Sequence, residues 1–470
     1  MLKRKPVYTT VLLVSIVSLF LLPSTHGLCS EKNNTSIENR AAMQLDTIQT
    51  DYGVKKAELK AFSLSNENVE DTSFLANVTD YGAQPDDSED DTAAIQAAIN
   101  AADGQNAVVR IPAGTFLINT DPQKGSLHVK DNIEIQMAEK TVLKSIPNAL
   151  PVYRIFTIYN GENIKISGGS LVGDRYKHEG TTGEFGHGIY IGGSSSKINI
   201  SNVKAQDFWG DGFFIEGDAK LQTYPTDIVI SQSEAHNNRR QGLSITAGKN
   251  IVIKNNIFSK TNGTAPEAGI DLERDPPFNL PLENVKLTNN KIIDNNGYGI
   301  AFVYASGNEA KNNVVLNNKG GGFYVGGNRE GNGTAEQNSI KNNFVSENGI
   351  GIYVNFSTDN HITNNTIIEN KKDGIFLVNH IGKNQLVNNF IAENQGNGIY
   401  VWGGLSNRRN IVIKSNEVES NWKTGIAIFE VTSATVTDNN LVNNRGEGLE
   451  VQAAKKSSIS SNKSKGNKSD

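Results

Sequence analysis

Residues 364–376 read Asn-Asn-Thr-Ile-Ile-Glu-Asn-Lys-Lys-Asp-Gly-Ile-Phe, and residues 388–400 read Asn-Asn-Phe-Ile-Ala-Glu-Asn-Gln-Gly-Asn-Gly-Ile-Tyr. Each stretch places an asparagine pair before a short apolar segment, and later a glycine before further apolar residues. The glycine step recurs at intervals of 23 to 30 residues, at Gly188, Gly212, Gly242, Gly269, Gly299, Gly322, Gly351, Gly374, Gly398, Gly425 and Gly448. Asparagine pairs keep nearly the same interval, at Asn289, Asn312, Asn342, Asn364, Asn388 and Asn439. A sustained period of this length indicates a repeat architecture.

One repeat has the length of a coil of two or three short strands, which can bury its apolar side only by stacking on other coils. Stacked coils lie about 4.8 Å apart and pair each strand with its equivalents above and below. Glycine and asparagine supply the left-handed backbone conformations of the corners, and stacked asparagine side chains can hydrogen-bond along the axis. The repeats lack the room and the helical period of an α-solenoid, and a propeller needs a longer repeat. We therefore expect an all-β, single-stranded parallel β-helix.

The N-terminal region differs from the repeats in composition. Basic residues at positions 3 to 5 precede an apolar run that is short for a membrane span, which predicts a secretory signal peptide and a secreted, extracellular protein. Lipid anchoring at Cys29 is not expected, because Leu28 is too large for lipoprotein cleavage. We expect the following segments along the chain: signal peptide 1–27, flexible polar leader 28–72, N-terminal cap and first coils 73–118, parallel β-helix 119–462 and polar tail 463–470.

Composition argues against several classes of function. The formal net charge of −5 lacks the excess of positive charge that is typical of nucleic-acid-binding proteins. No stretch after the N-terminal apolar run is apolar enough to span a bilayer. The single cysteine allows no intrachain disulfide, so stability must come from stacking. No His or Cys spacing specifies a metal, so we expect no required cofactor, although the abundant carboxylates are compatible with Ca²⁺. A monomer and a homotrimer both stay open.

A short helix is expected before the repeats begin. Asp90 or Asp91 can cap it, and its apolar residues recur at helical spacing, at Ile95, Ala98 and Ile99. The segment 108–116, Val-Val-Arg-Ile-Pro-Ala-Gly-Thr-Phe, reads as a strand followed by a turn.

Three motifs in this opening region carry a family resemblance. They read Tyr-Gly-Ala at 81–83, Asp-Asp-Thr-Ala-Ala-Ile at 90–95 and Ile-Pro-Ala-Gly-Thr-Phe at 111–116. Together they resemble the start of the pectate-lyase-3 superfamily, which includes rhamnogalacturonase-like and alginate-epimerase-like proteins. The resemblance implies a right-handed parallel β-helix whose open end is capped by the short helix. Lyases, hydrolases, epimerases and tailspikes share this opening, so it implies an architecture rather than a reaction.

A second resemblance covers residues 173–273. Its segments are similar to a signature of secreted bacterial β-helix proteins: Gly-Asp-Arg at 173–175, Gly-Glu-Phe-Gly-His-Gly at 183–188, Trp-Gly-Asp-Gly at 209–212, Asn-Arg-Arg-Gln-Gly at 238–242 and Gly-Ile-Asp-Leu-Glu at 269–273. The alginate epimerases carry an Asp-Pro-His catalytic motif, and that tripeptide does not occur in this sequence.

The repeat register predicts which side chains meet on the outer face. Within a strand, side chains alternate between the two faces. The second residue after each glycine should form one outward column: Tyr190, Phe214, Ser244, Asp271, Ala301, Tyr324, Tyr353, Phe376 and Tyr400. The fourth residue should form another, with Glu216, Thr246, Glu273, Asn355 and Trp402. The residue before each glycine should form a third, beginning His187, Asp211 and Gln241.

Charge on these columns is concentrated in four consecutive coils between residues 187 and 273. Asp271 and Glu273 lie two residues apart on one strand, which places their Cα atoms about 7 Å apart. Carboxylates at such separations suit glycoside hydrolysis, in which one donates a proton and another activates water. We predict Asp271 or Glu273 as the acid or base, Asp211 as its partner, and His187 as the vertical neighbour of Asp211. The alternative for this cluster is a structural salt-bridge network.

Other polar and aromatic residues near this cluster are predicted to bind substrate. Arg239 and Arg240 suit an anionic sugar, because guanidinium groups bind carboxylates at two points. Tyr324 and Tyr353 are either sugar-stacking subsites or an ordinary aromatic ladder. The remaining predicted binding residues are Gln241, Glu184, Glu216 and Tyr190.

Three functions are compatible with this pattern. The preferred one is a hydrolase acting on a uronate-containing polysaccharide, which would be the protein's partner. The second is a lyase or C5-epimerase, in which an arginine or a metal neutralises the uronate and His187 or Tyr190 abstracts the C5 proton. The third is a non-catalytic adhesin that binds glycans along the aromatic column.

Overall fold

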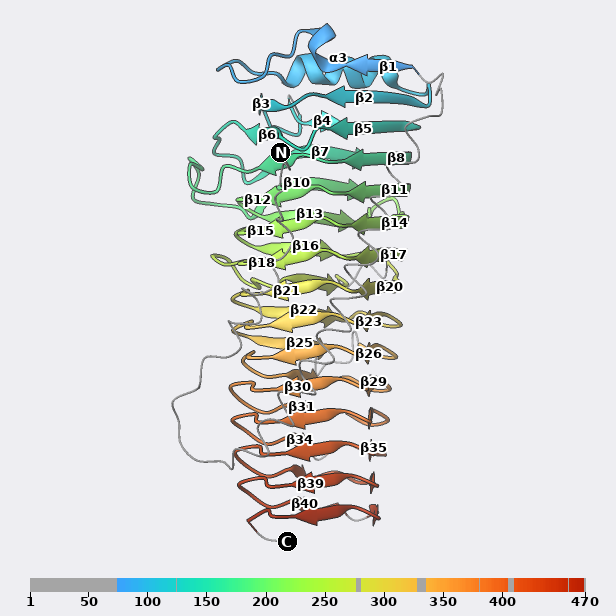
Figure 1. Ribbon diagram of the computed structural model, residues 1–470. Coiled ribbons are helices and arrows are strands. Elements are labelled where there is room, and N and C mark those ends of the chain that lie inside the picture. The colour runs from blue at the N-terminus through green and yellow to red at the C-terminus, as the bar shows by residue number, and fades with distance from the viewer. Residues whose placement is uncertain are drawn as a thin grey trace, which may run out of the picture. The chain divides into compact units, whose positions relative to one another are not determined.

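Three parallel sheets run along the axis of the repeat region, and each coil contributes one strand to each sheet (Figure 1). The computed structural model describes residues 74–468 except 124, 276–279, 328–334, 380, 405–409 and 455. These residues belong to one compact unit that spans residues 44–470. The coil of three strands joined by corners is therefore confirmed.

Sheet A has fifteen strands. They are β1 (Leu75–Asn77), β2 (Ala107–Ile111), β5 (Ile133–Met137), β8 (Glu162–Ser167), β11 (Ser196–Ser201), β14 (Thr226–Ser231), β17 (Gly248–Lys254), β20 (Leu282–Thr288), β23 (Glu309–Lys311), β26 (Ser339–Lys341), β29 (His361–Thr363), β32 (Gln385–Val387), β35 (Ile411–Lys414), β38 (Ala434–Thr437) and β41 (Ser458–Ser460).

Sheet B has fourteen strands. They are β3 (Gly114–Ile118), β6 (Thr141–Ser145), β9 (Ser170–Val172), β12 (Lys204–Gln206), β15 (Glu234–His236), β18 (Ile257–Ser259), β21 (Lys291–Ile293), β24 (Val314–Leu316), β27 (Phe344–Ser346), β30 (Thr366–Ile368), β33 (Phe390–Ala392), β36 (Glu417–Glu419), β39 (Asn440–Val442) and β42 (Lys463–Lys465).

Sheet C has thirteen strands and carries the predicted outer columns. They are β4 (Leu127–His128), β7 (Val152–Tyr159), β10 (Phe185–Gly192), β13 (Asp211–Glu216), β16 (Gln241–Ile245), β19 (Ile270–Glu273), β22 (Tyr298–Val303), β25 (Gly321–Gly326), β28 (Ile352–Asn355), β31 (Ile375–Val378), β34 (Ile399–Trp402), β37 (Ile426–Phe429) and β40 (Leu449–Gln452).

Columns of apolar side chains fill the interior of the stack. In sheet C, Ile189, Phe213, Leu243 and Ile270 are direct neighbours on successive strands, and each is at most 1% exposed. Burying a side chain of this size stabilises a protein by roughly 1.5–3 kcal/mol. Because successive coils add such residues in the same register, the core runs along the stack as far as the last coil, where Ile459 of β41 is 47% exposed.

Asparagine pairs form a ladder along one corner. In the pair at 289, Asn289 has a φ of 55° and turns the corner, while the buried Asn290 donates from Nδ2 to Asn313 Oδ1 at 3.1 Å and to the backbone oxygen of Ile253 at 2.9 Å. At the last predicted pair the register is shifted by one residue: Asp438 turns the corner with a φ of 60° and Asn439 occupies the ladder. The structural role predicted for the pairs is confirmed.

The helix α3 (Thr92–Ala102) forms where it was expected and buries Ile95, Ala98 and Ile99, after the 3₁₀ helix Val78–Tyr81. Asp91 stands at its N-terminus, but its carboxylate accepts from the backbone N–H groups of Gln84 and Leu117, at 2.9 and 3.0 Å, and makes no cap hydrogen bond. Capping falls to Asp90, whose Oδ1 accepts the backbone N–H of Thr92 at 3.0 Å.

Two expected boundaries differ from the structure. Residues 108–116 hold one strand and the start of another, because β3 begins at Gly114 directly after the turn at Pro112. Strand β42 (Lys463–Lys465) continues sheet B into the segment expected to be a tail. The signal peptide 1–27 and the whole leader 28–72, which includes Cys29, lie outside the described residues.

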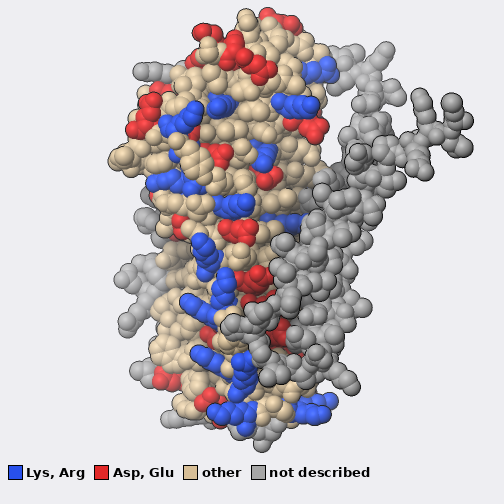
Figure 2. Space-filling model, turned by 60° about the vertical axis from the view of Figure 1, so that its left-hand side comes forward, with Lys and Arg blue, Asp and Glu red and all other residues tan. Residues whose placement is uncertain are grey.

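The surface carries both signs of charge. Figure 2 shows Lys and Arg side chains together with Asp and Glu side chains along the length of one face. Within the part of the chain that is described, no helix has the length and apolar character needed to cross a membrane.

Candidate functional site

The outer columns of sheet C form in the predicted register. Tyr190, Phe214, Ser244 and Asp271 are successive neighbours, and Asp211 lies beside Gln241. Their environment differs from the prediction, because these columns were expected to face solvent. His187, Asp211, Gln241 and Asp271 are at most 2% exposed.

Asp211 sits in a buried polar pocket. Its Oδ2 accepts hydrogen bonds from Arg240 Nη1 at 3.0 Å and from Ser244 Oγ at 2.8 Å. Its Oδ1 is buried and has no hydrogen-bond partner in the described structure. Burial raises the pKa of Asp211 to about 6, although Arg240 and the Ser244 hydroxyl act in the opposite direction. Oδ1 is therefore a buried acceptor to which no described residue donates.

Asp271 is the second buried carboxyl group. Its Oδ2 accepts from Gln241 Nε2 at 2.9 Å, and its Oδ1 has no hydrogen-bond partner among described residues. Burial and the nearby charge of Glu273 raise the pKa of Asp271 to about 7. The pKa of Glu273 is also raised, by burial and then by Asp275. Asp271 can therefore hold a proton near neutral pH, which an exposed aspartate cannot.

His187 is a neutral imidazole with a defined tautomer. The backbone N–H of Asp211 donates to His187 Nδ1 at 3.2 Å, so the ring proton resides on Nε2. Burial, followed by the positive charges of Arg154 and Arg240, lowers the pKa of His187 well below its ordinary value. The ring stacks on Phe214 with a centroid separation of 4.6 Å. In this tautomer Nε2 is a hydrogen-bond donor, which argues against His187 as a base.

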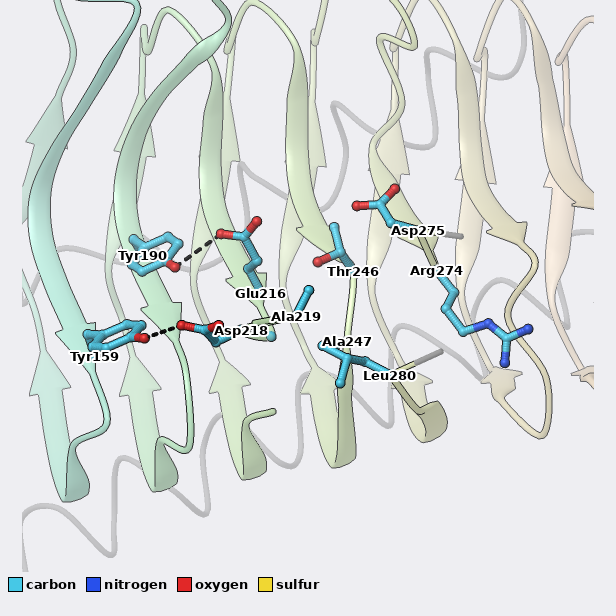
Figure 3. A pocket seen from close by; sticks show the side chains of 11 residues that line it. Tyr159, Tyr190, Glu216, Asp218, Ala219, Thr246, Ala247, Arg274, Asp275 and Leu280 are labelled. Atoms are coloured by element: carbon cyan, nitrogen blue, oxygen red, sulfur yellow. Dashed lines mark hydrogen bonds between the residues drawn. The ribbon is translucent and has the colours of Figure 1, made fainter. Parts of the chain in front are cut away.

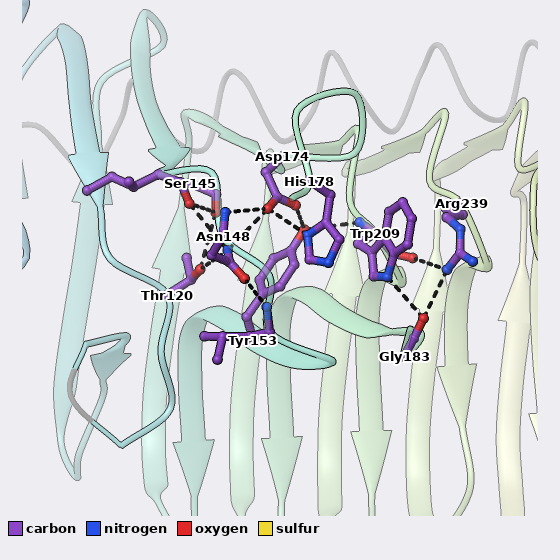
Figure 4. Close-up of polar contacts among 11 residues, drawn as sticks. Thr120, Ser145, Asn148, Tyr153, Asp174, His178, Gly183, Trp209 and Arg239 are labelled. Atoms are coloured by element: carbon purple, nitrogen blue, oxygen red, sulfur yellow. Dashed lines mark hydrogen bonds and ion pairs between the residues drawn. The ribbon is translucent and has the colours of Figure 1, made fainter. Parts of the chain in front are cut away.

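The two predicted arginines have different environments. Arg240 reaches the carboxyl cluster, where it bonds Asp211 and its Nε lies 3.4 Å from Glu184 Oε1. Arg239 turns away, stacks 3.7 Å above the Trp209 ring and donates from Nη1 to the backbone oxygens of Gly183 and Trp209 (Figure 4). Of the two arginines only Arg240 bonds Asp211, whereas the charge of Glu184 acts on both guanidinium groups. A role of either arginine in substrate binding stays a prediction.

Arg154 is a site residue that sequence reasoning missed. It precedes His187 in the same column, one coil earlier. Its guanidinium lies 3.4 Å above the Tyr190 ring, and its buried Nε has no hydrogen-bond partner in the described structure. Tyr190 donates from its hydroxyl to Glu216 Oε2 at 3.0 Å. The repeat pattern did not mark Arg154, because the columns were read from the glycines and Ile155 stands where the glycine would be.

A second polar cluster fixes the turn that leads into the site (Figure 4). Asp174 accepts from the Tyr153 hydroxyl at 2.5 Å and contacts His178 Nδ1 at 2.9 Å. The His178 ring stacks on Trp209 with centroids 4.2 Å apart. Both oxygens of Asp174 are used within the protein, so the cluster holds the 173–184 turn and with it Glu184. Sequence reasoning did not identify this Asp–His pair, which lies on a loop outside the repeat register.

The predicted aromatic column forms a continuous ladder away from the carboxyl cluster. Tyr324 lies 5.6 Å from Tyr353 between ring centroids, and Tyr353 stacks on Phe376 at 5.2 Å. The ladder continues in both directions, through Tyr298, Tyr400 and Phe429. These contacts are those of an aromatic ladder, and a sugar-binding role stays a prediction.

Beyond the strand ends, a cavity of about 280 Å³ adjoins the cluster, with Tyr190 and Glu216 in its lining (Figure 3). No group of three His, Cys, Asp or Glu residues within the described ranges is arranged to hold a metal ion.

Known proteins resemble this chain in sequence and in structure. A family model described as right-handed beta helix region matches residues 187–350 and 334–470. The uncharacterized protein YclG of Bacillus subtilis (strain 168) is 32% identical over 275 residues, which are 51% of this chain and 46% of YclG. Mannuronan C5-epimerase AlgE4 of Azotobacter vinelandii is 30% identical over 192 residues, which are 38% of this chain and 34% of the epimerase. The chain thus spans less than half the length of either relative.

Two solved structures share the architecture. The A-module of AlgE4 superposes with a TM-score of 0.56 at 20% identity, over 82% of this chain and 99% of the module. The family 28 exopolygalacturonase of Yersinia enterocolitica superposes with a TM-score of 0.55 at 13% identity, over 83% of this chain and 79% of that enzyme. At these identities the structural likeness shows the fold alone.

Proposed function

Because the chain belongs to the right-handed β-helix family, and because relatives in this fold are named as enzymes of mannuronan and polygalacturonate, we propose that it is a polysaccharide-active enzyme. The preferred activity is hydrolysis of a glycosidic bond in a uronate-containing polysaccharide. One observation carries this proposal: Asp211 and Asp271 are both buried, each has one unpartnered oxygen, and their pKa values are raised to about 6 and about 7. Secretion, predicted from the N-terminus, is part of the same proposal.

The two carboxyl groups can divide the work of hydrolysis. Asp271 donates its proton to the leaving glycosidic oxygen as the bond to the anomeric carbon breaks. Asp211 takes a proton from the water whose oxygen joins that carbon, so one water molecule is consumed per bond. Arg240 and Ser244 favour the ionised form of Asp211, which a base requires. His187 Nε2 can donate a hydrogen bond to a sugar hydroxyl, and Arg154 offers positive charge to a uronate.

The test is a panel of uronate-containing and neutral polysaccharides treated with the wild type, Asp211→Asn and Asp271→Asn. We expect new reducing ends without ultraviolet absorbance, and a loss of about 10²–10⁴-fold in either variant. Glu450→Gln is the matched control, because Glu450 occupies the same column as Asp271 in the last coil of sheet C. Unchanged activity in a folded Asp271→Asn variant would remove Asp271 from the mechanism.

A lyase or C5-epimerase is the second candidate, favoured by the sequence similarity to AlgE4 and by Arg154. In that reaction a base abstracts the C5 proton. His187 is poorly suited because its Nε2 carries the ring proton, and the pKa of Tyr190 is raised by burial, so the base would be a carboxylate. Absorbing unsaturated ends would identify a lyase, and deuterium uptake at C5 from heavy water without new ends would identify an epimerase. Glycan binding with neither product would indicate the adhesin.

A further inference from the structure

The outer face of sheet C changes from carboxyl groups to aromatic rings at the strands β22 and β25, which follow β19 in the stack (Figure 1). In the column of Asp271, these two strands carry Ala301 and Tyr324. Neighbouring strands lie about 4.8 Å apart, so Tyr324 is two coils, or about 10 Å, from Asp271. Because Ala301 contributes only a methyl group, Tyr324 is the first large side chain that follows Asp271 along this column.

Tyr324 is turned out of the parallel stack that the later rings form. The Tyr353 and Phe376 rings are inclined to each other by 14°, and the Phe376 and Tyr400 rings by 17°. The Tyr324 ring is inclined by 54° to Tyr353 and by 36° to Tyr298. Nearly parallel rings cover each other's faces, whereas a half-buried ring that is inclined to both neighbours keeps part of its face open.

A glycine makes room for this inclined ring. A Cβ built on Gly326 would clash with the hydroxyl end of Tyr324, so the ring leans along its own strand over Gly326. The same position holds a side chain after each of the later rings, at Asn355, Val378 and Trp402. Within this ladder, the missing side chain at Gly326 therefore accounts for the different direction of Tyr324.

The same arrangement at Tyr190 indicates what such a ring can hold. A Cβ built on Gly192 would clash with the hydroxyl end of Tyr190, so this ring also leans over the glycine two residues further along its strand. Its face carries the planar guanidinium of Arg154, 3.4 Å from the ring centroid. No described Lys or Arg side chain lies over the Tyr324 ring in this way, so its open face can take a ligand.

Tyr298 lies beside Tyr324 and enlarges the aromatic surface. A Cβ built on Gly321 would lie 2.7 Å from Tyr298 Cε1, so the Tyr298 ring leans over β25. Its centroid is 5.2 Å from that of Tyr324. Aromatic faces match the apolar faces of sugars, and the phenol hydroxyls can bond sugar hydroxyls. The two rings therefore have the chemistry of a surface on which a sugar ring stacks.

We propose that Tyr324, leaning over Gly326, and the adjacent Tyr298 form a stacking subsite for one sugar ring of the polysaccharide. The chain then runs along the axis of the coils, from Asp271 over Ala301 to Tyr324. Its place beside the bond that is cleaved rests on the proposed hydrolase function, whereas the stacking of a sugar rests on the geometry of the rings. The subsite ends at Tyr324, because the rings beyond it stack on one another.

The test measures how tightly oligosaccharides bind when each ring is altered. Chains of six galacturonate or six mannuronate units are titrated calorimetrically into Asp271→Asn, alone and combined with Tyr324→Ala, Tyr298→Ala, Tyr324→Phe or Gly326→Ala. We expect both substitutions to alanine at the tyrosines to weaken binding about tenfold or more, because the stacking surface is lost. Tyr324→Phe keeps the ring and should bind like its parent. Gly326→Ala keeps both rings but displaces Tyr324, and should weaken binding about threefold or more.

Tyr400→Ala is the matched control, since Tyr400 lies in the same column among the parallel rings. It should bind like its parent, and circular dichroism checks that each variant is folded. Gly326→Ala covers the case in which Tyr324→Ala does not fold. Unchanged binding in Tyr324→Ala or in Gly326→Ala, equal weakening in Tyr400→Ala, or no binding of either oligosaccharide to any of these proteins overturns the proposal.

Cleavage is measured in parallel with proteins that keep the native Asp271, as reducing ends released from the same oligosaccharides. Binding that is weakened in Tyr324→Ala, without any cleavage by the wild type, would keep the subsite and remove the hydrolase. Cleavage by the wild type with the same KM in Tyr324→Ala would keep the hydrolase and overturn the subsite.

Discussion

The coils from β10 to β19 and the coils from β22 to β40 use the same outward columns in opposite ways. In the first group the columns hold Asp211 and Asp271, which are buried and each have an unpartnered oxygen. In the second group the equivalent positions hold rings such as Tyr324 and Tyr353, which contact one another. Because both groups share the same apolar core columns, the outer columns can differ without changing the fold. The stacking of the coils sets which residues are neighbours, and the coils from β10 to β19 carry the buried carboxyl groups.

The largest difference between the groups should appear when an arginine is removed. The Arg240 side chain is 13% exposed and bonds the buried Asp211, so Arg240→Met leaves a buried carboxylate without its cation. We expect a loss of about 3–5 kcal/mol, seen as a lower thermal midpoint at pH 8. Arg445→Met is the control, because Arg445 lies exposed over Trp422, and should change stability by less than about 1 kcal/mol. Equal losses of stability in Arg240→Met and Arg445→Met would contradict the difference between the two groups of coils.

The next largest effect is expected from substituting an asparagine of the corner ladder, which should lower stability without changing catalysis. Asn343 donates to Asn365 Oδ1 and Ala310 O, and accepts from the backbone and side-chain nitrogens of Asn313. Asn343→Ala leaves these buried groups unsatisfied and should cost about 2–3 kcal/mol. Asn100→Ala, on the exposed face of the helix α3, serves as the comparison. Catalytic rates of the folded variants should stay as in the wild type, and a changed rate would mean that the later coils take part in catalysis.

The pH dependence of stability should reveal the cost of ionising the buried Asp271. The raised pKa of Asp271 means that its ionisation opposes folding. The cost is absent below the ordinary pKa of 3.8, grows as pH rises, and is complete above about 7. The thermal midpoint of Asp271→Asn, relative to wild type, should therefore rise between pH 5 and pH 8. A difference between Asp271→Asn and wild type that stays flat over this pH range would refute the buried-charge account.

The smallest effect is expected in the aromatic ladder. Tyr353 contacts Tyr324 and Phe376, so Tyr353→Ala should lower stability by about 1–2 kcal/mol. If the ring is only structural, KM for the polysaccharide stays within about threefold of the wild type. A larger rise in KM in Tyr353→Ala than in the ring-retaining Tyr353→Phe would mean that the polysaccharide also binds along the later coils.

The sequence predicted the fold and the register well, because both follow from local periodic signals. The glycine steps located the outward columns, and the neighbours of Asp271 on adjacent strands are those expected. Asparagine pairs predicted the ladder, since each corner needs one left-handed residue followed by one amide. The helix Thr92–Ala102 could be read from its apolar spacing.

Burial and long-range contacts could not be read in the same way. The columns predicted to face solvent are buried at Asp211 and Asp271, and the 173–184 turn, which leads to the contact of Glu184 with Arg240, lies outside the repeat. Arg154 lacks the glycine that marks its column, and the direction of Arg239 depends on Trp209 from another coil.

The most direct test of the central claim is cleavage of a uronate-containing polysaccharide in water enriched in oxygen-18. Hydrolysis by Asp211 and Asp271 predicts one labelled oxygen at each new reducing end and no ultraviolet absorbance. In Asp271→Asn both the new reducing ends and their label should be lost. Unlabelled reducing ends together with ultraviolet-absorbing unsaturated non-reducing ends would contradict hydrolysis and identify elimination instead.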